Sequence, residues 1–330
     1  MATMKTLNGY GINATELNGK TSDNYLLRTD TASDSAKLGG KAPEYYLQPR
    51  NLLDNSFWRR GSEIVNQRGQ TSYTDQVYGI DRWYGRANAQ SVEVRNTDIT
   101  VTATATAYVG IKQKIANIEE FAGETVTLAV YVYSTVGVAV GFTDADDNAI
   151  SETVDSSTGA RVILCTCTVP SNATPDTFIP RILLRTTAQN DYMRCYWAAL
   201  YEGSYTADTL PPYVPKGYTA ELAECQRYYY QSFSGSTAIG WDGAIIREAI
   251  SVNRIADVSF PQTMRIEKPT ITLYSPVSGN ANKVSEYLSD TDIDAKAGYR
   301  SRYRFMLTRE ASEFEIGKHY SMHYTVSADL

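Results

Sequence analysis

Residues 14–21, ATELNGKT, are the closest approach to a nucleotide-binding motif in this sequence. A phosphate loop needs glycine at its first position and lies between a buried strand and a helix, whose backbone N–H groups hold the phosphates. Here Ala14 stands at that position, and the flanking GYGIN and SDNYLLR have neither a strand nor a helix pattern. The sequence therefore does not predict a nucleotide site.

The two histidines of the chain, His319 and His323 in HYSMH, have the spacing of a zinc-binding helix. Tyr320 stands where that motif requires glutamate. In a strand, residues four apart share one face, so we interpret both as packed or solvated histidines. Because no G-x-S-x-G elbow is present either, we expect no Ser-His-Asp or Cys-His chemistry.

The four cysteines do not form the pattern of a metal site or a disulfide scaffold. Cys165 and Cys167 alternate in RVILCTCTV, so they should point to one face of a strand. Cys195 and Cys225 lie apart in the sequence, and four cysteines are too few to staple 330 residues. We interpret all four as buried free thiols, and we expect no metal and no cofactor.

Two acidic runs, residues 144–155 and 290–301, have the aspartate spacing of calcium loops. Both carry alanine at the sixth position, where the sharp turn favours glycine, and neither ends in glutamate. We interpret both runs as hairpin turns. A glycosidase would need only two well-placed carboxylates, which the sequence leaves open, but no motif supports an enzyme.

Aromatic residues are the remaining candidates for ligand binding, because their faces can stack on sugar rings. The chain has 25 Tyr, 8 Phe and 4 Trp. Trp83 and Trp197 lie among strand residues and are predicted to be in the core. Trp241, in the glycine-flanked SGSTAIGWDGA, is equally compatible with an exposed position. Trp241, Tyr299 and Tyr303 form the predicted ligand-binding set.

Alternation of apolar and polar residues indicates strands through most of the chain after residue 50. DITVTATATAYV and TVTLAVYVY are examples, and turn residues such as SSTG separate these segments. Regular short strands with such turns predict a β-sandwich. In residues 211–233, three prolines end this sandwich and Thr219 is predicted to cap one short helix, AELAECQ. A second, smaller set of strands follows.

The charge and hydropathy of the chain exclude several classes of partner. The net charge is −6 and the pI is about 5.2, without the clustered positive charge that nucleic-acid binding needs. No segment approaches the ~18 apolar residues of a membrane span. The N-terminal MATMKTLNGYG lacks the apolar core of a secretory signal. We expect a protein made in a cytosol, with no membrane span and no nucleic-acid partner.

Residues 17–28 and 38–49 repeat one short phrase, LNGKTSDNYLLR and LGGKAPEYYLQP. Their Leu and Tyr residues are spaced too thinly to offset the entropy of ordering the segment in a monomer. Burial becomes possible if identical chains wind together, or if the segment docks on another protein. We therefore expect residues 1–50 to form an extended stalk.

The order of several segments resembles the tail-fibre proteins of phages and prophages. These segments are TLNGYGINA, NLLDNSFW, VNQRGQTSY, YGIDRWY, AALYEGSYTADTLPPYVPKGYTAELAECQRYYY, FPQTMRIEKPTITLYS and HYTVSADL. The resemblance implies an all-β chain with an N-terminal extended fibrous segment (1–50) and a galactose-binding-like, carbohydrate-binding-module-like jelly-roll β-sandwich (51–218). A short helix and joint (219–232) and a small C-terminal β-sandwich (233–330) would follow.

The same resemblance implies a structural, non-enzymatic fibre of a phage virion, assembled in the host bacterial cytoplasm. Residues 1–50 would attach it to other virion proteins, and its β domains would contact a host-surface glycan or protein. NQRG and DRW are interpreted as segments that hold the fold together. The alternatives are a glycan-degrading tail-spike enzyme and a purely architectural collar or head fibre.

The stalk without its own core, together with the Tyr-rich composition, predicts a homotrimer. In native buffer, the protein should have a mass about three times the 36.6 kDa of one chain. Light scattering or native mass spectrometry measures this directly. A stable monomer at micromolar concentration would contradict the prediction.

Overall fold

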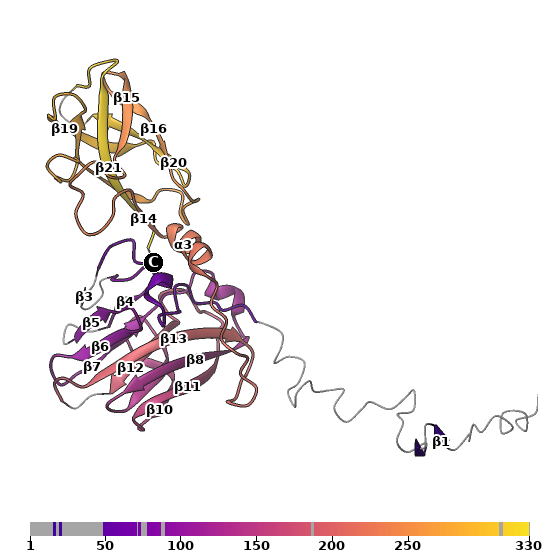
Figure 1. Cartoon of the computed structure of the whole chain (residues 1–330). Coiled ribbons are helices and arrows are strands. Elements are labelled where there is room, and N and C mark those ends of the chain that lie inside the picture. The colour runs from indigo at the N-terminus through magenta and orange to yellow at the C-terminus, as the bar shows by residue number, and fades with distance from the viewer. Residues whose placement is uncertain are drawn as a thin grey trace, which may run out of the picture. The chain divides into compact units, whose positions relative to one another are not determined.

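The structure is a computed structural model, and it describes residues 16–17, 20–21, 49–70, 72–73, 78–86, 90–185, 188–309 and 313–329. The predictions for residues 1–48 therefore lie outside the described residues, apart from a short antiparallel pair, β1 (Glu16–Leu17) and β2 (Lys20–Thr21). In the rest, strands far outnumber helices, so the all-β prediction is confirmed (Figure 1). Among the described residues, no helix is both long and apolar enough to cross a membrane.

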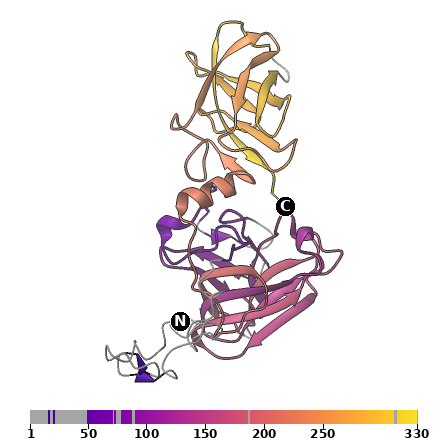
Figure 2. The same cartoon turned by 90° about the vertical axis from the view of Figure 1, so that its right-hand side faces the viewer.

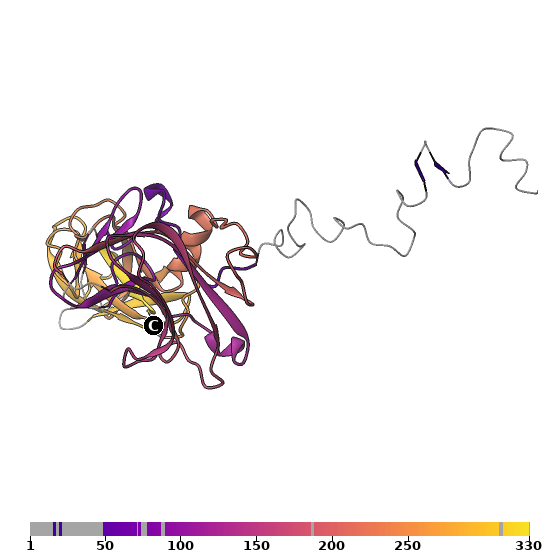
Figure 3. The same ribbon diagram turned by 90° about the horizontal axis from the view of Figure 1, so that it is seen from below.

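The first β domain is a sandwich of two antiparallel sheets, with strands that run from purple to pink in Figures 1 and 3. One sheet has the order β10 (Ala149–Asp155), β9 (Val138–Thr143), β12 (Ile179–Arg185), β7 (Tyr108–Lys112) and β4 (Tyr84–Gly85). The other has the order β11 (Gly159–Thr168), β8 (Thr125–Ser134), β13 (Tyr192–Glu202), β6 (Ile99–Ala103), β5 (Gln90–Val94) and β3 (Ser72–Tyr73). From β6 to β13, consecutive strands change sheets at every step except the β9–β10 hairpin. This is the connectivity of a jelly roll.

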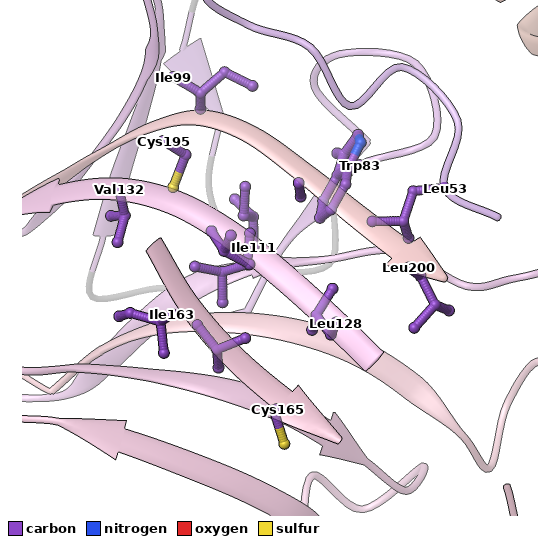
Figure 4. Close-up of a cluster of buried hydrophobic side chains, with 14 of the residues drawn as sticks. Leu53, Trp83, Ile99, Ile111, Leu128, Val132, Ile163, Cys165, Cys195 and Leu200 are labelled. Atoms are coloured by element: carbon purple, nitrogen blue, oxygen red, sulfur yellow. The ribbon is translucent and has the colours of Figure 1, made fainter. Parts of the chain in front are cut away.

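The core of this sandwich follows from the two-residue period of its strands. On β8, Val126, Leu128, Val130 and Val132 all point inward and are fully buried. Figure 4 shows such side chains meeting between the sheets, with Trp83 among them. Two short 3₁₀ helices, Gly61–Glu63 and Ile118–Phe121, complete the domain. The burial of Trp83 confirms its predicted place in the core.

Trp197 was predicted to lie in the core, and that prediction is wrong. A β-bulge shifts the register of β13 between Cys195 and Trp197, so that Tyr196 and Trp197 both leave the core face. Trp197 is half-buried outside the core, stacked on Tyr213 at 4.9 Å between ring centres. The extra residue of a bulge cannot be read from alternation, which assumes an unbroken period of two.

Three of the four cysteines are buried free thiols, as predicted, and Cys167 is free but only half-buried. Cys165 lies in the core and Cys167 packs against the same core from the same face of β11. Cys195 and Cys225 are fully buried.

Each acidic run was predicted to be a hairpin turn, but it is a turn only in its first residues and then continues as a strand. Residues 144–148 form the β9–β10 turn, in which Asp144 Oδ1 accepts the backbone N–H groups of Asp146 (3.0 Å) and Asn148 (2.8 Å), but 149–155 are strand β10. In the second run, residues 290 and 291 end the turn after β18 (Lys283–Glu286), and most of the rest is strand β19 (Asp292–Gly298). Alternating Ile293, Ala295 and Ala297 point into the second core, which decides that segment in favour of a strand.

The predicted short helix exists as α3 (Tyr218–Gln226), but its predicted cap is wrong. Gly217, with φ of 81°, occupies the N-cap position, and Thr219 lies inside the helix. Glu221 is in the first turn, as expected, yet its Oε2 accepts the backbone N–H of Asn55 at 2.7 Å. This carboxylate therefore makes a tertiary contact with a distant loop, which the sequence of the helix alone could not predict.

The second β domain, orange to yellow in Figure 2, is built around β21 (His319–Ser327). The first part of β21 pairs with β15 (Ile245–Ser251) and β18 (Lys283–Glu286), and its end pairs with β14 (Tyr229–Gln231) and β17 (Thr270–Tyr274). From β15, the order continues through β16 (Arg254–Ser259), β20 (Arg304–Arg309) and β19 to β18. Because β18 pairs again with β21, the sheet closes around its core.

Both β domains belong to one compact unit, and NQRG and DRW contribute to the contacts between them. Gln67 Nε2 donates to the carbonyl oxygen of Tyr229 at 2.8 Å. The guanidinium of Arg68 lies 3.7 Å from the centre of the Tyr229 ring and pairs with Asp81 at 3.1 Å. The interpretation of NQRG and DRW as fold-holding segments is confirmed.

Asn55 is a second point of connection, and it is buried with a φ of 48°. Its Nδ2 donates to the carbonyl oxygens of Val65 (2.7 Å) and Asp81 (2.8 Å), and its Oδ1 accepts the N–H of Val65 (2.9 Å). Asparagine tolerates this left-handed backbone better than most residues do. One side chain thus ties three loop segments together.

The carboxylate of Asp81 predicts a pH dependence of stability. Asp81 Oδ2 accepts the N–H of Gln67, and Oδ1 accepts a hydrogen bond from Arg68. Burial nevertheless raises the pKa of Asp81 from 3.8 to about 6, because desolvation outweighs these two contacts. The folded state therefore binds this proton more tightly than the unfolded state does. The resulting stabilisation is present near pH 4 and is lost as the pH rises through about 6.

Replacing Asp81 with Asn removes this titration. The free energy of unfolding of the native protein, relative to Asp81→Asn, should decrease by up to about 3 kcal/mol between pH 4 and pH 7, at about 1.4 kcal/mol per pKa unit. Urea denaturation at a series of pH values measures it. Parallel pH profiles for the two proteins would contradict the assignment to Asp81.

Candidate functional site

The outer face of the five-stranded sheet carries charged and aromatic side chains where β7 and β12 pair. Ile182 and Leu184 of β12 point into the core, so Arg181, Leu183 and Arg185, at the odd-numbered positions, face outward. On this outer face Arg181 lies opposite Lys112, Leu183 opposite Gly110, and Arg185 opposite Tyr108. The pairing of two strands that are about 70 residues apart in the chain thus creates a polar surface on the sandwich.

Two pockets open on this face, and we call them together the sheet groove. The first has a volume of about 190 Å³ and is lined by Arg86, Tyr108, Asp147, Glu152, Arg181, Leu183 and Arg185. The second has a volume of about 270 Å³ and is lined by Tyr78, Tyr84, Lys112, Lys114, Ala145, Asp176 and Ile179. An ion pair lies between the two pockets: Nζ of Lys112, which lines the second, is 2.8 Å from Oδ1 of Asp147, which lines the first.

Two carboxylates hold the cations of the first pocket in place. Asp147 pairs with Arg86 and Lys112, and its backbone oxygen accepts a hydrogen bond from Arg181 at 3.0 Å. Glu152 accepts from Arg181 and from Arg185, each at 2.9 Å. Arg181 is only 4% exposed and forms the floor. The guanidinium groups are therefore fixed before any ligand arrives.

The electrostatics of Asp147 follow from these neighbours. Burial alone would raise the pKa of Asp147, but the hydrogen bond from Lys112 and the charges of Lys112 and Arg86 outweigh it and lower that pKa below its ordinary value. At Arg185, the hydrogen bond with the Tyr108 hydroxyl is the main cause of a raised pKa. Both groups remain charged at neutral pH.

Tyr108 is the exposed wall of the first pocket. Its ring is 47% exposed, and the guanidinium of Arg185 lies 4.9 Å from the ring centre. Arg185 also donates to the Tyr108 hydroxyl at 3.2 Å. An aromatic ring that is held beside fixed donors can stack on a ligand while those donors hydrogen-bond to it.

The opposite sheet carries a row of aromatic side chains that is less suited to binding. Tyr131 lies 4.9 Å from Tyr196, and Trp197 stacks on Tyr213, which in turn stacks on Phe57 at 5.6 Å. These rings turn their faces toward one another. A sugar ring needs a free aromatic face, so we interpret this row as packing that covers the sheet.

The structure places the predicted set Trp241, Tyr299 and Tyr303 on the second β domain, where they are 44%, 65% and 59% exposed. Trp241 packs edge-on against Tyr287, and Tyr299 accepts a hydrogen bond from Arg254 at 2.7 Å. In the part of the chain that the structure describes, no ring contact joins Trp241 to either tyrosine. Their role in binding stays a prediction.

One of the two histidines is held by packing and a hydrogen bond in the second β domain. His323 Nε2 lies 2.8 Å from the carbonyl oxygen of Gly240, and burial lowers the pKa of His323, so it is a packed histidine, as predicted. Within the described residues, no group of three or more His, Cys, Asp or Glu side chains could hold a metal ion.

Sequence reasoning missed the sheet groove, although a signal was present. In IPRILLR, Arg181 and Arg185 are four residues apart and so share one face of a strand, and in YVGIK, Tyr108 and Lys112 do the same. Charged and aromatic residues at the outward positions of otherwise apolar strands indicate a polar outer surface that could bind a ligand. That β7 and β12 are neighbours was not readable from either segment.

No protein-family model matches this chain, and no curated protein matches it either. Solved structures similar to parts of it include a CBM4 structure, which is 13% identical (39% of this chain, 92% of that chain, TM-score 0.32). Another is a mutant family 29 carbohydrate-binding module complexed with cellulohexaose, 11% identical (42% and 94%, TM-score 0.30). A third is the enzymatically active domain of tailspike protein 4 of bacteriophage CBA120, 13% identical (46% and 21%, TM-score 0.30). Identities this low transfer no functional residue to this chain.

Proposed function

We propose that this protein binds a glycan in the sheet groove, without catalysis. The observation that carries the proposal is the exposed ring of Tyr108 beside guanidinium groups that ion pairs already hold in place. Sugar recognition requires an apolar face for the ring and directed hydrogen bonds for its hydroxyl groups. Fixed charged donors form the stronger class of such bonds.

The carboxylates of the groove support binding rather than hydrolysis. A glycosidase needs one carboxyl group with a raised pKa to act as the acid. The pKa of Asp147 is instead lowered, and Glu152 is engaged by two arginines. The third carboxylate, Asp176, is exposed and pairs with Lys114 at 2.5 Å. None of the three has the buried, unpaired environment that makes a general acid.

We also propose that the protein is a phage fibre located in the virion, with residues 1–50 attached to other virion proteins and the β domains directed toward a host-surface glycan or protein. The order of the tail-fibre-like segments supports this proposal. A homotrimer would bring three sheet grooves to one surface, which increases avidity for a repetitive glycan.

The glycan site is tested on a panel of immobilised neutral and acidic oligosaccharides. Tyr108→Ala should lower the affinity for a bound oligosaccharide at least tenfold, because the stacking face is lost. Tyr218→Ala, at a tyrosine of α3 that is 43% exposed and outside both candidate sets, serves as the matched control and should stay within twofold of the native protein. Tyr299→Ala and Tyr303→Ala test the predicted set on the second β domain. Soluble oligosaccharide should not be released during the incubation.

Two results would count against the glycan site. If Tyr299→Ala abolishes binding and Tyr108→Ala does not, the site lies on the second β domain. If the native protein binds none of the panel, glycan binding itself is wrong.

The attachment proposal is tested by deleting residues 1–50. The shortened protein should retain its β domains, shown by an unchanged cooperative unfolding transition, but should be missing from purified particles. Immunoblotting of particles assembled with the full chain or the deletion measures incorporation. Equal incorporation of both would show that attachment uses another part of the protein.

A further inference from the structure

We infer that the glycan which the sheet groove binds carries an anionic group, a carboxylate in particular, and that Arg181 and Arg185 receive it. The inference rests on the proposed function and specifies its ligand class. It concerns the first pocket of the groove, between β7, β12 and the β9–β10 hairpin.

The first argument is the charge balance of this pocket. Three cationic side chains line it, Arg86, Arg181 and Arg185, and among the described residues they pair with two carboxylates, Asp147 and Glu152. Asp147 is shared further with Lys112 of the neighbouring pocket. The pocket therefore has an excess of one positive charge, although the whole chain has a net charge of −6. A positive pocket on an acidic protein is a local feature and does not reflect its general composition.

The second argument is the close approach of like charges across the two strands. Arg181 lies directly opposite Lys112 on the outer face, an arrangement that destabilises a sheet unless an anion separates the two. Asp147 lies near both, at 2.8 Å from Lys112 Nζ and 3.5 Å from Arg181. Arg185, four residues further along β12 on the same face, shares Glu152 with Arg181 and is the more exposed of the two. A ligand anion at Arg185 would complete the neutralisation.

The third argument is unused hydrogen-bonding capacity. The Nε atoms of Arg86 and Arg181 are buried and have no hydrogen-bond partner. Buried donors without acceptors are costly, and the side chain of Arg181 is only 5% exposed. Guanidinium groups bind carboxylates through paired N–H donors, so a carboxylate fits this pocket better than a neutral hydroxyl group does.

The size of the pocket limits what enters it. A volume of about 190 Å³ is below the roughly 300 Å³ at which pockets begin to enclose a drug-sized ligand. One sugar residue with its carboxylate can enter, stacked on Tyr108, while the rest of the glycan extends along the sheet. Residues with this chemistry are uronic acids and other carboxylated sugars.

The test compares a hyaluronan oligosaccharide, which contains glucuronate, with the same oligosaccharide after its carboxyl groups are reduced to alcohols. Titration calorimetry with the full chain should show at least tenfold tighter binding of the carboxylated form. This preference should weaken as the salt concentration rises. An oligosaccharide of neutral sugars that carries sulfate esters and no carboxyl groups shows whether any anion suffices or whether the planar carboxylate is required.

Arg185→Gln removes a cation that the carboxylate would contact and should lower the affinity for the carboxylated probe at least tenfold. Arg185→Lys keeps the charge without the paired donors and should lie between Arg185→Gln and the native protein. Arg302→Gln removes the same charge from the second β domain and, as the matched control, should stay within twofold of the native protein. Equal losses of Arg185→Gln for the carboxylated and the carboxyl-reduced probe would show a merely structural role, and urea denaturation of each variant shows whether it is folded.

The outcomes separate this inference from the proposed function. If both forms of the probe bind equally, or only neutral members of the panel bind, the carboxylate inference is wrong and glycan binding stands. If the sulfated probe binds as well as the carboxylated one, the anionic site stands and the preference for a carboxylate is wrong. If no oligosaccharide of either kind binds, both proposals fail.

Discussion

The buried amide of Asn55 is the contact on which the arrangement of the first β domain depends. It joins its own loop to those that contain Val65 and Asp81, and its backbone N–H donates to Glu221 of α3. Its carbonyl oxygen accepts the indole N–H of Trp58 at 2.8 Å, which holds that ring in the core. Removing the side-chain amide would leave its backbone partners at Val65 and Asp81 unsatisfied, at about 1–3 kcal/mol each. The contacts of Asn55 with Glu221 and Trp58 use its backbone N–H and backbone carbonyl oxygen, so they depend on the amide through the loop conformation that it holds.

With its loops held in this way, the sandwich has two outer faces, and they differ in chemistry. On the six-stranded sheet, aromatic rings cover one another, so the face is closed to flat ligands. On the five-stranded sheet, glycines replace side chains: a Cβ at Gly110 would lie 2.1 Å from the carbonyl oxygen of Ile182, and one at Gly141 would lie 2.2 Å from that of Ser151. At these two positions the neighbouring backbone lies too close for any side chain, so the paired strands accommodate only glycine there.

The ion pairs of the groove are an expensive way to stabilise a fold, because desolvation of charges often exceeds their mutual attraction. Apolar residues at Arg181 and Glu152 would cover this face at lower cost. The contrast with Arg68 is informative, since its carboxylate partners and the Tyr229 ring together link two β domains. A charged network that links no domains, beside an exposed tyrosine, is better explained by a ligand than by stability.

Local patterns alone determined a large part of this protein: the strands, the sandwich class, the helix at 218–226, and the common face of Cys165 and Cys167. These depend on the period of two or 3.6 residues, which is a property of consecutive positions. Tertiary structure alone decided that a bulge turns Trp197 outward, that Glu221 binds Asn55, and that Arg181 lies opposite Lys112. The physical reason is that the packing of the whole core sets the register between strands that are distant in the sequence. The residues of either strand alone do not contain that information.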